Sequence, residues 1–103
     1  MPKAYVVFTE DIHDPEGIKA YAAAARDPIH AHGGTVLVAD RGPEVLEGEW
    51  FGNQSVVIEF ESVEAARGWY DSPEYQAAVA LRRGSARTNA VILTAFERPA
   101  RTS

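Results

Sequence analysis

This sequence of 103 residues contains no cysteine, which excludes disulfide bonds and thiol chemistry. That composition is compatible with a reducing compartment, and we expect a cytoplasmic protein. The sequence also has no apolar run near the length of about 20 residues that a membrane span needs. The first residues, Met1-Pro2-Lys3, lead directly into a short apolar segment and lack the pattern of a signal peptide.

An excess of positive charge is also missing. Lysine and arginine number 10 against 15 acidic residues, for a net charge of −5. Nucleic acid and anionic membrane surfaces attract basic patches, so we expect neither as a partner. His30 and His32 form an H-x-H pair without an evident third ligand, so we predict no metal site. We also predict no cofactor, with haem held by a histidine as a minor alternative.

Four short apolar runs predict β-strands, and each run carries apolar residues on both faces. Residues 5–8, 36–38, 54–62 and 91–93 hold these runs. In the third run, Val57 lies among polar neighbours on the face opposite Ile58, because side chains alternate along a strand. Four strands of this kind predict a sheet that is covered on both faces. The strands are expected over residues 3–10, 34–40, 54–62 and 88–96.

Capping residues predict where the helices begin and end. Asp14, Ser62 and Ser72 precede apolar periodic stretches and are suitable N-caps, and proline follows the first and third of them. Pro28 is expected to kink the first helix or divide off its last turn. Gly33 or Gly34 is expected to end that helix in the left-handed conformation. The helix that begins after Ser72 is expected to reach about residue 84.

The order strand, helix, strand, strand, broken helix, strand predicts a ferredoxin-like α+β fold. In this fold two crossovers place the helices on one face of a four-stranded antiparallel sheet. We expect a single domain over residues 1–97 and a flexible tail over residues 98–103. The second, apolar face of the sheet then has no cover within the chain. We therefore predict a homodimer in which two sheets face each other, forming a dimeric α/β barrel.

The connection over residues 41–52, here called the arm, is too long for a tight hairpin. It contains apolar residues, Trp50 among them, beside three glutamates. Those apolar side chains need a docking surface. The arm is therefore expected to pack on its own sheet or on a partner subunit, and the sequence leaves both alternatives open.

Several motifs together resemble one family. These are the segment LEGEW at residues 46–50, VVIEF at 56–60, WYDSPEYQ at 69–76, and the pair Leu81-Arg82. They are similar to the domain-of-unknown-function family 1330, and the resemblance covers nearly the whole chain. The resemblance implies a dimeric α/β barrel but no reaction, since the family has no settled activity. Related barrels include cofactor-free monooxygenases, haem-dependent enzymes, isomerase-like proteins and stress-responsive proteins.

The sequence departs from the family pattern at two positions. Arg41 is the nearest candidate for an arginine that often follows the second strand, and Gln54 stands where an arginine often precedes the third strand. If these arginines bind an anion in the family, the site in this protein is altered or lost. The resemblance also selects Arg82 as a residue that could bind a carboxylate.

Two hypotheses for function follow. In the first, a small homodimeric protein binds a small organic molecule, an acid being one option, in a cavity between sheet and helices, as an isomerase-like or monooxygenase-like enzyme without a cofactor. Glu59 and His32 are then the candidate proton donors or acceptors. The candidate ligand-binding residues are Arg82, Trp50, Tyr5, Tyr75 and Arg41.

In the second hypothesis, the protein is a non-enzymatic structural or stress-related dimer with a filled barrel and no ligand. A free cavity of roughly 300 Å³ or more with convergent polar groups distinguishes the first from the second.

Overall fold

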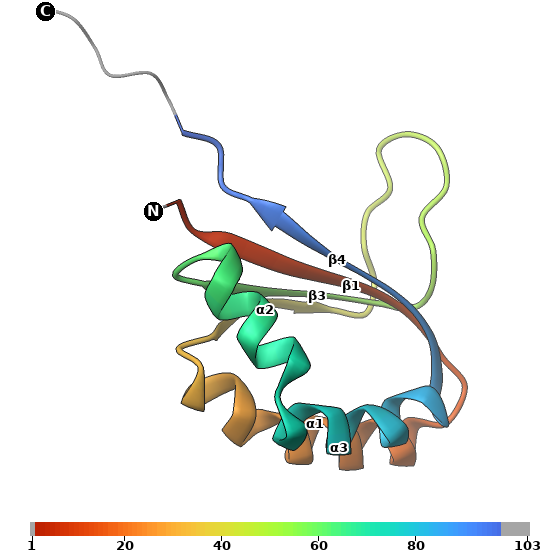
Figure 1. Cartoon of the computed structure of the whole chain (residues 1–103). Helices are drawn as coiled ribbons and strands as arrows, with labels where there is room; N and C mark the ends of the chain where they lie inside the picture. Colours follow the sequence, from red (N-terminus) through yellow and green to blue (C-terminus); the bar gives the residue numbers. More distant parts are fainter. Residues whose placement is uncertain (1, 98–103) are drawn as a thin grey trace, which may run out of the picture.

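A computed structural model describes residues 2–97 of the chain. The elements follow in the order β1 (Ala4–Ile12), α1 (Pro15–Ala31), β2 (Thr35–Asp40), β3 (Gln54–Phe60), α2 (Val63–Asp71), α3 (Pro73–Arg83) and β4 (Ala86–Thr94). The strands form one antiparallel sheet in the order β2-β3-β1-β4. All three helices lie on one face of this sheet (Figure 1). The predicted α+β architecture is therefore confirmed, while the predicted tail over residues 98–103 lies outside the described residues.

The predicted helix caps are present. Asp14, Ser62 and Ser72 each accept a hydrogen bond from the backbone N–H three residues later, at 3.2, 3.0 and 3.2 Å. These bonds satisfy N–H groups that have no partner inside the helix. Ser72 serves two helices, because its backbone N–H also donates to the Trp69 carbonyl at 3.1 Å and ends α2. The break between the second and third helices is thus fixed at the residue that the sequence indicates.

The first helix ends at the predicted glycines. Gly33 has a φ of 74°, and its N–H donates to the His30 carbonyl at 3.0 Å. The N–H of Gly34 donates to the Ile29 carbonyl at 2.8 Å, which completes a Schellman motif. Pro28 does not divide the helix, since α1 continues through it to Ala31. Of the two expectations for Pro28, the separated last turn is wrong.

Strand pairing moves three ends of β1 and β4 away from their predicted positions. β1 continues to Ile12 and β4 begins at Ala86, because these two residues pair with each other. β4 stops at Thr94, which pairs with Ala4, the first residue of β1. Strand ends are set by the partner strand as well as by local preference. As a consequence Glu10 lies inside the sheet instead of at its end.

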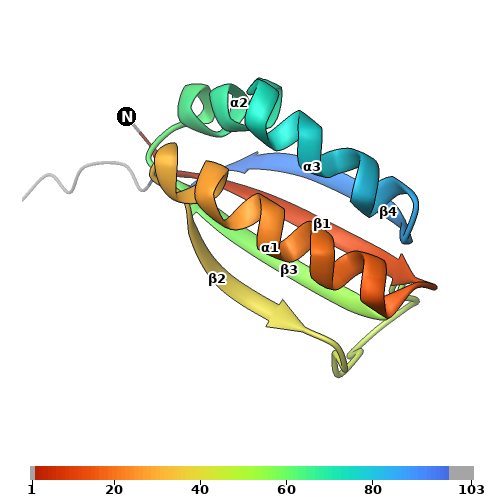
Figure 2. The same ribbon diagram turned by 90° about the horizontal axis from the view of Figure 1, so that it is seen from below.

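The core lies between the sheet and the helices. Ala4, Val6 and Phe8 of β1 and Ile58 and Phe60 of β3 point to the helical face and are buried. They pack against aromatic side chains of α2 and α3, including Trp69 and Tyr75. Figure 2 shows that α1 lies over β1 and β3, and that β2 projects beyond it. Every residue of β2 is accordingly exposed.

The opposite face of the sheet, here called the open face, is apolar and carries no helix. Val57 and Val91 flank Val7 across this face, and Leu93 lies opposite Tyr5. Val91 and Leu93 are 51% and 52% exposed. The arm rises on the same side, away from the helices (Figure 1). The prediction that both faces of the sheet carry apolar residues is confirmed.

Replacement of Gly52 by alanine should destabilise the fold. Gly52 has a φ of 86°, and a Cβ at this position would collide with the backbone carbonyl of Glu10. The next residue, Asn53, donates its N–H to that carbonyl at 2.7 Å. We expect Gly52→Ala to lose about 1–3 kcal/mol of unfolding free energy in urea denaturation. Gly42→Ala is the control, since a Cβ there meets nothing within 4 Å; equal stability of the two variants would contradict the expectation.

Candidate ligand cavity

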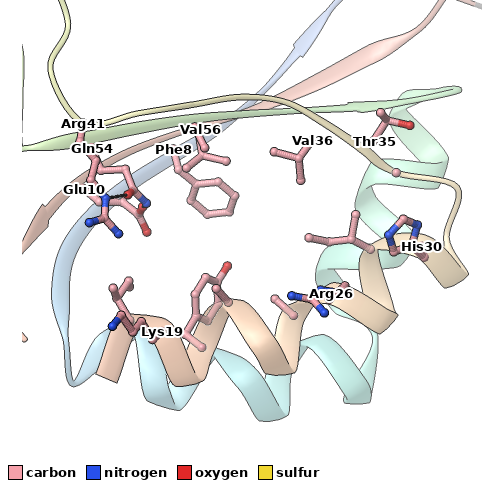
Figure 3. A pocket seen from close by; sticks show the side chains of 17 residues that line it. Phe8, Glu10, Lys19, Arg26, His30, Thr35, Val36, Arg41, Gln54 and Val56 are labelled. Carbon is pink, nitrogen blue, oxygen red and sulfur yellow. Dashed lines mark hydrogen bonds between the residues drawn. The ribbon is translucent and has the colours of Figure 1, made fainter. Parts of the chain in front are cut away.

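A cavity of about 600 Å³ lies on the helical side of the sheet, between α1 and the strands β2 and β3 (Figure 3). It exists because β2 extends past the edge of α1, so that no helix fills the space beside it. Its size is in the range of pockets that hold small organic molecules. Its apolar walls include Phe8, Ile18, Ala25, Ile29, Val36 and Val56.

A chain of polar side chains closes one end of this cavity. The Arg41 Nε donates to the Gln54 Oε1 at 3.0 Å, and the Gln54 Nε2 donates to the Glu10 Oε1 at 2.9 Å. Figure 3 shows these three side chains together at the end opposite Arg26 and His30. Gln54 thus connects a cation to a carboxylate. Arg41 keeps guanidinium N–H groups that are free to bind an anion.

Glu10 is the acid of this group, and it is buried at 2% exposure. Burial raises the pKa of its carboxyl, because the charged form loses hydration. The hydrogen bond from Gln54 and the charge of Arg82 oppose that rise without cancelling it. A carboxyl with a raised pKa in the wall of a cavity is suited to accept and return a proton.

Two tyrosines connect α1 to α3 beside the cavity. The hydroxyls of Tyr21 and Tyr75 are 2.7 Å apart. Burial raises the pKa of both phenols, so that both are neutral hydrogen-bond donors at ordinary pH. Tyr21 lines the cavity, whereas Tyr75 is fully buried behind it. Tyr75, a predicted ligand-binding residue, therefore reaches the cavity only through Tyr21.

Arg82 is buried behind the cavity at 5% exposure. Its guanidinium carbon lies 5.3 Å from the ring centre of Phe8 and 5.7 Å from that of Tyr21. Both rings belong to the cavity wall, and Arg82 stands on their far side, outside the lining residues. In this position its charge acts on Glu10 through the wall.

Three other predicted site residues lie on the opposite side of the sheet. Tyr5 and Glu59 are paired on the open face, where the Glu59 Oε1 is 3.3 Å from the Lys3 Nζ. The Trp50 Nε1 donates to the Ser55 Oγ of the same face at 2.8 Å, and Trp50 is 52% exposed. The sheet separates these residues from the cavity. They belong to a different surface from that of Arg41, Glu10 and Tyr21.

His32 is the C-cap of α1, and its Nδ1 lies 2.9 Å from the Pro28 carbonyl oxygen. It does not line the cavity, whereas His30 does. Within residues 2–97, no three histidine, aspartate or glutamate side chains gather where they could hold a metal ion. In the same part of the chain, no helix has the length and apolar character needed to cross a membrane.

Sequence reasoning missed Glu10 and Tyr21 as site residues. A signal for Glu10 was present, since Ala4, Val6, Phe8 and Glu10 fall on one face of the first strand. An acid that continues an apolar alternation is expected to be buried. Tyr21 belongs to the apolar stripe of α1, and such a stripe does not show which of its members faces a cavity.

The fold and its cavity define a small α+β protein with a ferredoxin-like arrangement of strands and helices. The chain belongs to the family described as Domain of unknown function (DUF1330), whose model matches residues 3–96. The family resemblance drawn from the motifs is therefore confirmed. The comparison with curated proteins gives no match.

Solved structures with the same fold are distant in sequence. A protein of unknown function from Rhodopseudomonas palustris, RPA0582, is 17% identical with a TM-score of 0.75, over 94% of this chain and 85% of that one. SnoaB, a cofactor-independent oxygenase from Streptomyces nogalater, is 15% identical with a TM-score of 0.67, over 95% and 97%. A dimeric ferredoxin-like protein of unknown function from Thermobifida fusca is 15% identical with a TM-score of 0.63, over 91% and 92%. These similarities confirm the ferredoxin-like fold.

Glu10→Gln should change how stability depends on pH. Because burial raises the pKa of Glu10, the folded state favours the protonated carboxyl. Its contribution to stability is complete below the ordinary value of 4.5 and falls as the pH rises from there through the folded pKa. The neutral glutamine should remove this fall. The stability of the variant relative to the wild type should therefore increase as the pH rises from 4.5 through the folded pKa of Glu10.

Urea denaturation between about pH 4 and pH 8 measures this effect. Glu59→Gln is the control, since it removes an acid from the open face. An unchanged pH profile in Glu10→Gln would show that the carboxyl is hydrated in the folded protein.

Proposed function

We propose that this protein binds a small, partly apolar organic acid in the cavity between α1 and the sheet. The observation that carries the proposal is the contrast between the cavity and the rest of the chain. Of the 17 lining residues, all within the described part of the chain, Lys19, Arg26 and Arg41 are basic and Glu10 is the one acid. The whole sequence has 15 acids and 10 bases. A basic rim around apolar walls is complementary to an anion with an apolar body.

The roles of the side chains follow from their positions. Arg41 binds the carboxylate of the ligand at the polar end, since its guanidinium can form paired hydrogen bonds with two oxygens. The apolar body of the ligand lies between α1 and β3. Tyr21 donates a hydrogen bond, and Glu10 exchanges a proton with a carbon or oxygen of the ligand. These roles extend the earlier hypothesis, with Glu10 in the place first considered for Glu59 and His32.

Such a proton transfer needs no group beyond the side chains of the protein. SnoaB, which has the same fold, is described as a cofactor-independent oxygenase. We propose that this protein is an enzyme whose chemistry begins with proton abstraction by Glu10. The reaction that follows the abstraction depends on the ligand.

We further propose a homodimer formed through the open face. Its apolar residues are half-exposed in the single chain, and no helix lies on that side (Figure 1). The arm adds exposed Val45, Leu46 and Trp50 to the same side. Contiguous apolar surface of this kind is typical of an interface. The related Thermobifida fusca protein is described as dimeric.

Binding of naphthalene-2-carboxylate tests the cavity. We expect saturable chemical-shift changes at residues of α1 and β3 in amide NMR spectra. Ala22→Phe fills the cavity and should abolish binding, while Ala24→Phe, on the same helix but outside the lining, should not. Arg41→Gln should weaken the binding of the carboxylate about tenfold and leave the binding of the corresponding uncharged carboxamide unaffected. Equal affinity of the two phenylalanine variants would contradict the proposed site.

Leu93→Asp tests the dimer. Leu93 lies on the open face, so that a second sheet packed there would bury the new carboxylate without a partner. We expect the dissociation constant of the dimer to increase at least about tenfold, as measured by light scattering over a dilution series. Leu81→Asp is the matched control, because Leu81 is similarly exposed, at 41%, but lies on α3. A wild-type monomer at micromolar concentration would contradict the dimer and leave the cavity proposal untouched.

A further inference from the structure

A second recess lies on the helical side of the sheet, near the edge strand β4. It has a volume of about 290 Å³ and is lined by Tyr70, Arg82, Arg83, Ala86, Thr88 and Ala90. Its walls come from the ends of α2 and α3 and from β4. This lining contains two arginines and no acid. The recess shares no lining residue with the larger cavity.

Two buried polar atoms of this recess have no hydrogen-bond partner. They are the Nε of Arg82, whose residue is 5% exposed, and the Oγ1 of Thr88. Buried donors without partners are rare in folded proteins, and each calls for an explanation such as a bound ion or ligand. Arg82 and Thr88 lie on different elements, and both residues line this recess.

The positive charge of the recess is not neutralised within the described residues. The ion pairs between 2 and 97 join Lys3 with Glu59, Lys19 with Glu16, and Arg67 with Asp71. Neither Arg82 nor Arg83 takes part in them. The acid on which the charge of Arg82 acts is Glu10, which is already bound by Gln54 and lines the other cavity.

We propose that this recess is a second binding site, which holds a small oxyanion such as a carboxylate or phosphate group. The guanidinium groups of Arg82 and Arg83 supply charge and N–H donors, and the Thr88 hydroxyl supplies a further donor. The volume accommodates an anion of this size with water. The proposal does not require a ligand in the larger cavity.

Arg82 also links this site to Glu10. On one side it lines the recess, and on the other it faces the rings of Phe8 and Tyr21 in the wall of the larger cavity. Its charge lowers the pKa of Glu10 against the effect of burial. An anion bound to Arg82 offsets that charge, so that it should raise the pKa of Glu10. By thermodynamic linkage, ionisation of Glu10 should weaken the binding of the anion to the recess.

Titration with sodium phosphate and with sodium acetate tests the proposal. Amide NMR spectra are recorded at constant ionic strength set with sodium chloride, and calorimetry measures affinity. We expect saturable shifts at β4 and the end of α3, and a higher Glu10 pKa in the bound protein. Thr88→Val and Arg83→Gln should each weaken binding about tenfold. Thr94→Val and Arg87→Gln are matched controls on the same strand, and Arg87 contacts Phe51 on the other side of the sheet.

The outcomes separate the sources of the anion. Tighter binding of phosphate than acetate identifies a phosphate site, and comparable or tighter binding of acetate identifies a carboxylate site. No saturable binding of either anion by about 10 mM would overturn the proposal. Equal losses of anion affinity in Arg83→Gln and Arg87→Gln would also overturn the proposal, because they would show that the anion is attracted by net charge alone. Circular dichroism and thermal unfolding confirm that the variants are folded.

Discussion

The packing of Trp69 against Tyr75 fixes the position of the helices on the sheet. Trp69 is fully buried, and its ring centre lies 4.1 Å from that of Tyr75 and 5.2 Å from that of Phe60. The hydroxyl of Tyr75 then connects to Tyr21 and so aligns α1 with α3. With α1 held over β1 and β3, no helix remains for β2 (Figure 2). The large cavity is therefore a consequence of how the aromatic core aligns the two helices.

The polar residues beside this core are costly to bury, and we attribute their presence to the binding roles proposed for them. Glu10 and Arg82 are both buried, and burial of charged groups costs free energy that hydrogen bonds recover only in part. An apolar pair of similar volume would fill the same space at a lower cost. Instead, Gln54 supports the carboxyl while the Arg82 Nε has no partner. Unpaired buried groups and groups with shifted pKa values are more common at functional sites than elsewhere, and we therefore place the two proposed sites beside these residues.

Local signals predicted the fold well, and contacts between distant segments limited the prediction of the site. Asp14, Ser62 and Ser72 cap helices through bonds to residues three positions away, so their sequence neighbourhood contains the whole signal. The strand ends depended on partners more than 70 residues distant, as in the pairing of Ile12 with Ala86. That extension turned Glu10 from an apparent strand terminus into a buried acid. The alternation of a strand likewise separates its two faces without showing which one borders a cavity, and Glu59 was selected on the open face for this reason.

The acidic character of the whole chain does not oppose the proposed anionic ligands, because exposed charges are screened over short distances. Glu44, Glu47 and Glu49 lie on the arm, which rises from the open face, whereas the cavity and the second recess lie on the helical side (Figure 1). At physiological ionic strength, charges in water are screened beyond about 8 Å. An anion near either cavity therefore responds to the arginines beside it and little to the net charge of −5. Salt screens a buried charge such as that of Arg82 less than an exposed charge. The electrostatic potential near Arg82 therefore favours anions as the proposed ligands of the helical side.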